Sequence, residues 1–158
     1  MKTIFINGES GGAIGANTYV YYDERTLAGA VIDPGAEPHK IIEIIYSKNI
    51  DIRFILLTHG HFDHIAAVPH IKQSCNADIC VLKEENIILS NPLFNASILF
   101  GNPMKLIADK FLNDGDEIYI GNETLKVIHT PGHTVGGACY YDKKTTLFSP
   151  VIQFFMNP

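Results

Sequence analysis

The sequence predicts an α/β or α+β sandwich, in which two strand-rich halves are interspersed with short helices. Short segments rich in β-branched and aromatic residues, bounded by Gly, Asn or Asp, recur in both halves. Between them, residues 39–48 carry Ile41, Ile44 and Ile45 on one helical stripe. Residues 54–57 form a continuous apolar run, which is typical of a strand covered on both faces. At 158 residues the chain fits one domain, expected to span residues 1–158.

The first half is expected to alternate strands with helices. Pro38 and Pro69 suit the first turn of a helix, because proline needs no N–H partner there and its φ is already helical. The helices that they open are expected over residues 39–48 and 69–75, and a further helix over residues 84–89. The predicted strands of this half cover residues 3–6, 18–22, 28–32, 54–57 and 78–82.

The second half begins with a long surface loop over residues 91–104, which contain Pro92, Gly101 and Pro103. Composition does not distinguish a lid over a site from a plain connection. Strands then follow at residues 117–120, 124–128, 137–141 and 146–149, with a hairpin turn at residues 121–122. Tyr140 and Tyr141 either line a pocket or are simply a core residue and its surface neighbour.

Composition excludes several classes of partner. A net charge of −5 without a Lys/Arg cluster argues against binding to nucleic acid or to an anionic membrane. No apolar run approaches the roughly 20 residues of a membrane span, and the run at the N-terminus stops at Asn7, too short for a signal peptide. Three cysteines without CxxC spacing are expected to be free thiols in a reducing compartment. We therefore expect a cytoplasmic protein.

The most informative segment follows the strand at residues 54–57 and contains His59, His61, Asp63 and His64. In an extended segment, residues two apart project to the same side, so His59 and His61 can face one point. Asp63 and His64 lie in the following turn and can face a second point nearby. Two metals about 3.5–4 Å apart can stabilise both the attacking and the leaving oxygen of a hydrolysis. Imidazole and carboxylate ligands suit Zn²⁺, and also Fe or Mn. The alternative is a chance cluster of surface histidines.

His133 is the natural third ligand beside His59 and His61, because it lies on a Pro-Gly turn after a predicted strand. His39 and His70 lie on helical stretches and are expected to face solvent. His129 is expected to be a packed or supporting group rather than a ligand. Asp33, which ends the strand at residues 28–32, either hydrogen-bonds a ligand imidazole or only caps its turn.

Residues 58–64 (THGHFDH) and 130–136 (TPGHTVG) resemble motifs of the metallo-β-lactamase superfamily, in its short glyoxalase II-like (hydroxyacylglutathione hydrolase-like) branch. The resemblance extends to residues 32–35 and 111–116. It implies an αββα sandwich with metals at one edge of its two sheets. His59, His61 and His133 would bind the first metal, and Asp63 with His64 the second; Asp63 is also assigned a catalytic role. A metal-bound hydroxide would attack a thioester or ester carbonyl of a small-molecule substrate.

The chain departs from this family pattern after residue 148. The family places Gly-Asp-Thr there, with an aspartate that bridges both metals, and a further histidine later; here residues 149–158 read SPVIQFFMNP. We hypothesise a frameshift near codons 149–150, because a shifted reading of suitable codons yields Gly-Asp-Thr-Ile-Phe-Tyr-Glu-Ser. The alternative is a naturally shortened paralogue. The expected product is a truncated domain that lacks its last strands and helix, with residues 150–158 packed on the uncovered surface or pairing in a homodimer by domain exchange.

The leading functional prediction is therefore a metal-dependent hydrolase of thioester or ester bonds, with weak or no activity in this form. It would hold one zinc ion or none, where the family holds up to two, and would fill the first site preferentially. An iron-dependent persulfide dioxygenase-like enzyme or a lactone hydrolase could use the same ligands. A different class remains open: a non-catalytic metal-binding or interaction module that kept the scaffold.

Overall fold

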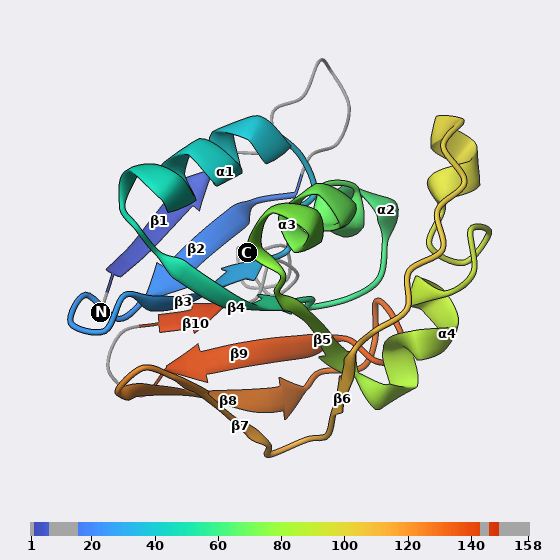
Figure 1. Ribbon diagram of the computed structural model, residues 1–158. Coiled ribbons are helices and arrows are strands. Elements are labelled where there is room, and N and C mark those ends of the chain that lie inside the picture. Colours follow the sequence, from blue (N-terminus) through green and yellow to red (C-terminus); the bar gives the residue numbers. More distant parts are fainter. Residues whose placement is uncertain (1, 7–15, 143–145, 149–158) are drawn as a thin grey trace, which may run out of the picture.

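The computed structural model describes residues 2–6, 16–142 and 146–148. Two β-sheets pack face to face, and helices cover the outer face of the larger one (Figure 1). The strands are β1 (Lys2–Ile6), β2 (Thr18–Tyr22), β3 (Ala28–Ile32), β4 (Asp51–Leu56), β5 (Asp78–Leu82), β6 (Lys110–Leu112), β7 (Glu117–Ile120), β8 (Glu123–His129), β9 (Ala138–Asp142) and β10 (Thr146–Phe148). The helices are α1 (Pro38–Ser47), α2 (Phe62–Ile65), α3 (Val68–Cys75) and α4 (Asn86–Leu89), with 3-10 turns η1 (Lys83–Glu85) and η2 (Ser97–Phe100).

The larger sheet has the strand order β1-β2-β3-β4-β5-β6, and the smaller one the order β10-β9-β8-β7. Strands β3, β4, β5 and β6 run parallel to one another, whereas β1, β2 and β3 are antiparallel. The smaller sheet is antiparallel throughout. Because parallel strands end at the same edge, the segments that follow β3 and β4 emerge side by side.

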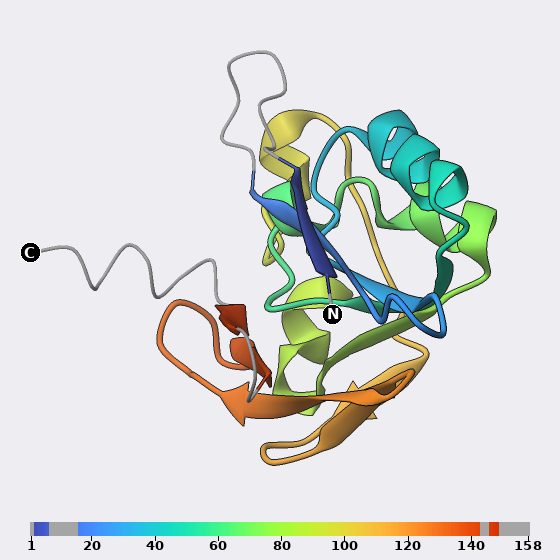
Figure 2. The same cartoon turned by 90° about the vertical axis from the view of Figure 1, so that its left-hand side faces the viewer.

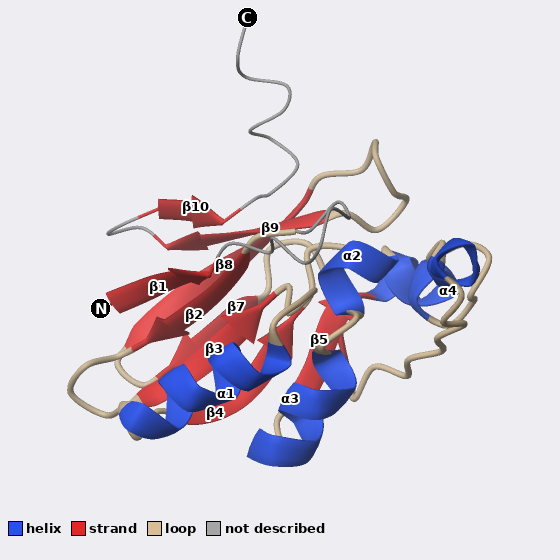
Figure 3. Cartoon of the chain, turned by 90° about the horizontal axis from the view of Figure 1, so that it is seen from above, coloured by secondary structure: helices blue, strands red, loops and turns tan. Residues whose placement is uncertain are grey.

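Alternating residues of the larger sheet face two different cores. One core lies under α1 and α3, which pack against each other and against the sheet (Figures 1 and 3); it includes Val20, Val31, Ile41 and Ile71. The other core lies between the sheets (Figure 2) and contains the residues Tyr21, Ala30, Ile32, Leu56, Leu125, Val127 and Tyr140. This arrangement confirms the predicted sandwich.

Strand and helix positions agree closely with the sequence prediction, with three differences. The predicted helix at residues 84–89 is a 3-10 turn followed by α4, the turn after His61 forms the short helix α2, and β6 was not predicted. Residues 91–104 form the predicted long connection, which contains η2. The predictions for residues 149–158, including their packing and domain exchange, lie outside the described residues. The extent of the domain stays a prediction.

Candidate metal centre

The candidate site lies at the edge of the sandwich where β3 and β4 end. Residues 58–64 follow β4, and residues 130–137, between β8 and β9 of the smaller sheet, reach the same edge. The two segments are joined at their base, where the Ala138 N–H donates to the Thr58 carbonyl at 2.8 Å. The loop at residues 130–137 is closed by a hydrogen bond of 2.7 Å from the Thr130 N–H to the Gly137 carbonyl.

Three histidines from these segments converge. His61 Nδ1 lies 2.9 Å from His133 Nε2, and the ring of His59 lies 4.8 Å from that of His61 and 4.9 Å from that of His133. One nitrogen can be chosen from each ring so that the three nitrogens all lie within 4.8 Å of one another. Nitrogens that share a tetrahedral metal at about 2.0–2.1 Å lie roughly 3.4 Å apart. The donor set and its spacing therefore fit a divalent metal ion.

The environment favours the neutral form of the imidazoles, which is the form that binds metals. Burial, reinforced by the nearby His64, lowers the pKa of His59 far below its ordinary value. Burial and the adjacent His133 likewise lower the pKa of His61. His59 is almost fully buried, His61 is half-buried and His133 is exposed, so the cluster opens to solvent on the His133 side. That these residues bind a metal remains a prediction that the geometry permits.

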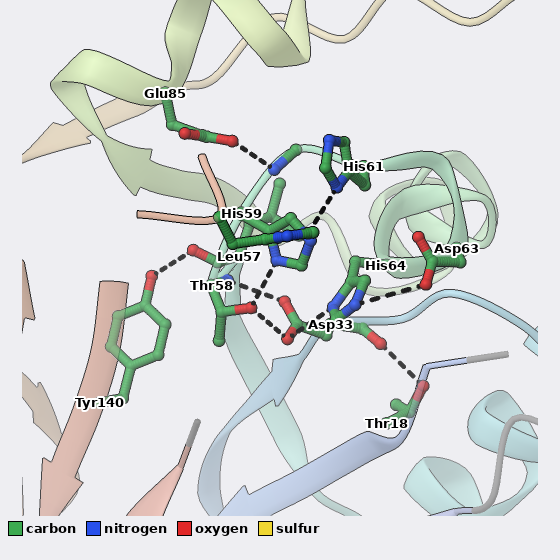
Figure 4. A network of polar contacts seen from close by, with 12 residues as sticks. Thr18, Asp33, Leu57, Thr58, His59, His61, Asp63, His64, Glu85 and Tyr140 are labelled. Atoms are coloured by element: carbon green, nitrogen blue, oxygen red, sulfur yellow. Dashed lines mark hydrogen bonds and ion pairs between the residues drawn. The ribbon is translucent and has the colours of Figure 1, made fainter. Parts of the chain in front are cut away.

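The predicted ligands of a second metal lie directly beside this cluster. The ring of His64 lies 4.0 Å from that of His59, and His64 Nε2 is 3.5 Å from Asp63 Oδ2 (Figure 4). On the opposite side of the ring, His64 Nδ1 is 3.0 Å from Asp33 Oδ2. Burial is the largest single influence and lowers the pKa of His64, but the charge and hydrogen bonding of Asp33 together with the charge of Asp63 outweigh it, so the pKa is raised.

Asp33 faces the imidazole of His64, a predicted ligand, and its carboxylate binds Thr58 rather than only capping its own turn. Its carboxylate accepts hydrogen bonds from the Thr58 N–H at 2.8 Å and the Thr58 hydroxyl at 2.6 Å, and it also faces the His64 imidazole (Figure 4). It therefore ties the end of β3 to the first residue of the His59 segment. Gly35 brings the same turn against α2, because a Cβ at this position would lie 1.6 Å from the Asp63 carbonyl oxygen.

The remaining histidines and the two tyrosines behave as the more ordinary interpretations predicted. His39 and His70 are exposed on α1 and α3. His129 is not part of the cluster; its Nε2 lies 3.0 Å from the Val135 carbonyl oxygen, across the His133 loop. Tyr140 is fully buried and its hydroxyl donates to the Leu57 carbonyl at 2.8 Å, whereas Tyr141 is on the surface and lines a pocket that contains none of the candidate ligands.

Glu85, at the end of η1, is a residue that the sequence did not single out. It is fully buried, and its two carboxylate oxygens accept hydrogen bonds from the N–H groups of Gly60 and Gly136, at 2.9 and 2.8 Å. Burial raises the pKa of Glu85, with these hydrogen bonds opposing the shift. Both partners are backbone amides, so no side-chain motif marks the interaction. The hydrogen bonds of these amides to Glu85 could therefore be identified only in the three-dimensional structure.

Comparison with known proteins agrees with this geometry. The family model described as the metallo-beta-lactamase superfamily matches residues 11–148, most of the chain. The chain belongs to the metallo-β-lactamase superfamily. Its fold is accordingly that of the superfamily, as the sequence motifs predicted. Superfamily members are hydrolases in general, and the histidine cluster of this chain could hold a metal ion.

Relatives within the superfamily include characterised and uncharacterised proteins. The probable metallo-hydrolase YqgX of Bacillus subtilis is 35% identical, over 86% of this chain and 64% of its own length. Hydroxyacylglutathione hydrolase GloC of Haemophilus influenzae is 30% identical, over 84% of this chain and 64% of its own length. The chain thus spans less than two thirds of these curated relatives.

Solved structures show the same fold. The BLEG-1 B3 metallo-beta-lactamase superposes with a TM-score of 0.83 at 33% identity, covering 94% of this chain and 71% of that one. TTHA1623, solved in a di-iron-bound form, superposes with a TM-score of 0.69 at 26% identity, covering 87% of this chain and 67% of that one. In the described part of the chain, no helix has the length and apolar character needed to cross a bilayer.

Proposed function

We propose that this metallo-β-lactamase superfamily member is a metal-dependent hydrolase of thioester or related acyl bonds in small molecules, with weak activity expected of this chain. The observation that carries the proposal is the convergence of His59, His61 and His133 from two distant segments. The 30% identity with a hydroxyacylglutathione hydrolase supports the thioester as substrate class. Zinc is the metal that we propose, and iron and manganese suit the same donors.

We assign the following roles to the residues of the site. A bound divalent cation supplies Lewis acidity toward an acyl carbonyl and lowers the pKa of water. His59, His61 and His133 would hold it, with the exposed side of His133 leaving room for substrate. Asp63, whose side chain is 25% exposed and lies 3.5 Å from His64, is the candidate to orient the attacking water and hold its proton.

We expect one metal per chain. Within the residues that the structure describes, His59, His61 and His133 form the one group of three donors at metal-binding distance. Asp63 and His64 are the two donors left for a second ion, and two ligands are fewer than a firm site needs. The second ion would therefore bind more weakly than the first.

Hydrolysis of a hydroxyacylglutathione thioester by the zinc-loaded chain tests the proposal. His133→Ala should lower kcat/KM at least about 100-fold, on the scale that loss of one electrostatic group costs an enzyme. His70→Ala is the control, because it removes an exposed imidazole outside the site and should leave the rate unchanged. Equal rates for the parent chain and the His133 variant would contradict the proposal. Oxygen consumption by the iron-loaded chain with a glutathione persulfide, without thioester hydrolysis, would replace it with the oxidative reaction.

A further inference from the structure

Glu85 lies between the two segments that carry the histidines, although it contacts neither segment's ligands directly. Its Oε1 accepts the N–H of Gly60, which stands between His59 and His61 (Figure 4). Its Oε2 accepts the N–H of Gly136, three residues after His133. One buried carboxylate thus joins two loops from different sheets, each through a backbone amide.

The packing around these glycines shows how closely the loops approach Glu85. A Cβ at Gly136 would lie 2.2 Å from the Glu85 nitrogen and 2.7 Å from its Cα. A Cβ at Gly60 would lie 3.0 Å from the Leu89 nitrogen on α4. Any side chain at Gly136 would therefore push the loop away from η1, and one at Gly60 would crowd α4.

The loops have a second connection, and the two together constrain the histidines. At the base, the Ala138 N–H donates to the Thr58 carbonyl at 2.8 Å. The Tyr140 hydroxyl also donates to the Leu57 carbonyl at 2.8 Å, but bonds at the base alone would let the loops open or twist about it. The additional bonds to Glu85, beyond the base on both loops, fix their separation and their relative angle. Hydrogen bonds to a charged acceptor are stronger than neutral ones, which suits Glu85 to this task.

We infer that Glu85 is a positioning residue of the metal centre: it holds residues 58–61 and 130–137 at the separation that lets His59, His61 and His133 share one cation. This inference rests on the proposed function, because it concerns the same site. Loss of an outer group that orients metal ligands typically costs about 10- to 100-fold in metal affinity. The effect of Glu85 should fall in this range.

Zinc affinity of the full chain, measured by competition with a chromophoric chelator, tests the inference. Glu85→Gln keeps the shape of the side chain but replaces one carboxylate oxygen by an NH2 donor, so it can accept one of the two amide N–H groups but not both. It should weaken zinc binding about 10- to 100-fold and alter the visible absorption of the cobalt-substituted protein. Glu85→Asp keeps the charge but shortens the reach, and should give an intermediate loss; it serves if the glutamine variant does not fold.

Asp142→Asn is the matched control, because Asp142 is also a buried carboxylate but accepts the Tyr21 hydroxyl at 2.9 Å, on β9 outside the site. It should lose thermal stability while keeping the parent's zinc affinity and cobalt spectrum. Parent-like binding by both Glu85 variants would overturn the inference and leave the proposed function standing. A loss of affinity in the Asp142 variant as large as in the Glu85 variants would also overturn it, since removing an unrelated buried carboxylate would then weaken zinc binding equally. A parent chain without zinc binding would overturn the proposed function, and the inference with it.

Discussion

At the residue scale, Asp33 shows how a single buried carboxylate organises the site. Its backbone has φ 48°, in the left-handed region that aspartate tolerates better than most residues. This conformation turns the chain sharply after β3, and the Thr18 hydroxyl binds the Asp33 carbonyl at 2.8 Å. The side chain is thereby aimed at both Thr58 and His64. The contacts of Asp33 with Thr58 and His64 thus compensate for the strain of the turn.

Replacing Asp33 should therefore cost more than a typical buried substitution. Asp33→Ala leaves the Thr58 N–H and hydroxyl without their acceptor and the His64 ring without its charged neighbour, and should lower the free energy of unfolding by about 3–5 kcal/mol. Asp33→Asn retains one acceptor and the tolerance of positive φ, so it should cost less. Urea unfolding of the metal-free chain measures both values.

The control for this prediction is Asp51→Ala. Asp51 pairs with Arg53 at 2.9 Å, but the two side chains are 60% and 62% exposed. An exposed pair of this kind contributes roughly 0–1 kcal/mol. A loss at Asp33→Ala no larger than at Asp51→Ala would show that the carboxylate does not organise the turn.

At the element scale, the connection over residues 91–104 is built around the buried amide of Asn95. Its Nδ2 donates to the carbonyls of Leu89 and Met104, at 3.3 and 2.8 Å, and its Oδ1 accepts the Ser97 N–H at 3.0 Å. The Asn95 carbonyl also accepts the N–H of Phe62, the first residue of α2, at 2.8 Å. The segment is therefore tied to the helix that carries Asp63 and His64.

Asn95→Ala should loosen this segment, because it removes three hydrogen bonds of a fully buried side chain. The free energy of unfolding should fall by about 2–3 kcal/mol, and amide hydrogen exchange at Ser97 should become faster. Asn91→Ala is the control, since Asn91 Oδ1 accepts only one exposed N–H, that of Leu93, at 2.9 Å. Unchanged exchange at Ser97 in the Asn95 variant would contradict this description of the segment.

At the scale of the whole molecule, local patterns predicted most strands and the convergent histidines but not the contacts between distant segments. Residues 18–22, 28–32, 78–82 and 117–120 form the predicted strands, because most of their β-branched and aromatic residues are buried in the sheets; Tyr119, which is 66% exposed, is an exception. Strand β6 was missed because it has three residues, of which two are exposed, and is defined by pairing with β5.

Glu85 was missed for the same physical reason. In the sequence it stands beside Glu84 and Lys83 and is typical of a solvated helix surface. Its burial depends on hydrogen bonds to amides 25 and 51 residues away in the sequence, and local residue periodicity carries no information about such distant partners. The histidine cluster was predictable because metal chemistry restricts residue type and spacing. A carboxylate that binds backbone amides, in contrast, places almost no restriction on which residues supply those amides.

The two sheets are joined at several points around the site, so protein contacts bring the histidines together. Tyr140 of β9 binds the Leu57 carbonyl at 2.8 Å, Ala138 binds Thr58 at the same distance, and Tyr21 of β2 binds Asp142 at 2.9 Å. All three bonds cross from one sheet to the other; the first two lie beside the segments that carry His59 and His133, and the third lies at the opposite end of β9, away from the site. The fold therefore prepares the site that the proposed chemistry requires.

Zinc titration of the parent chain and of His133→Ala tests this account most directly. The parent chain and the His70→Ala control should each bind one zinc ion tightly. The His133 variant should bind it more weakly by more than the roughly 100-fold that loss of an outer group can cost, because a direct ligand from the second sheet is gone. Identical affinity and stoichiometry for the parent chain and the His133 variant would contradict the account.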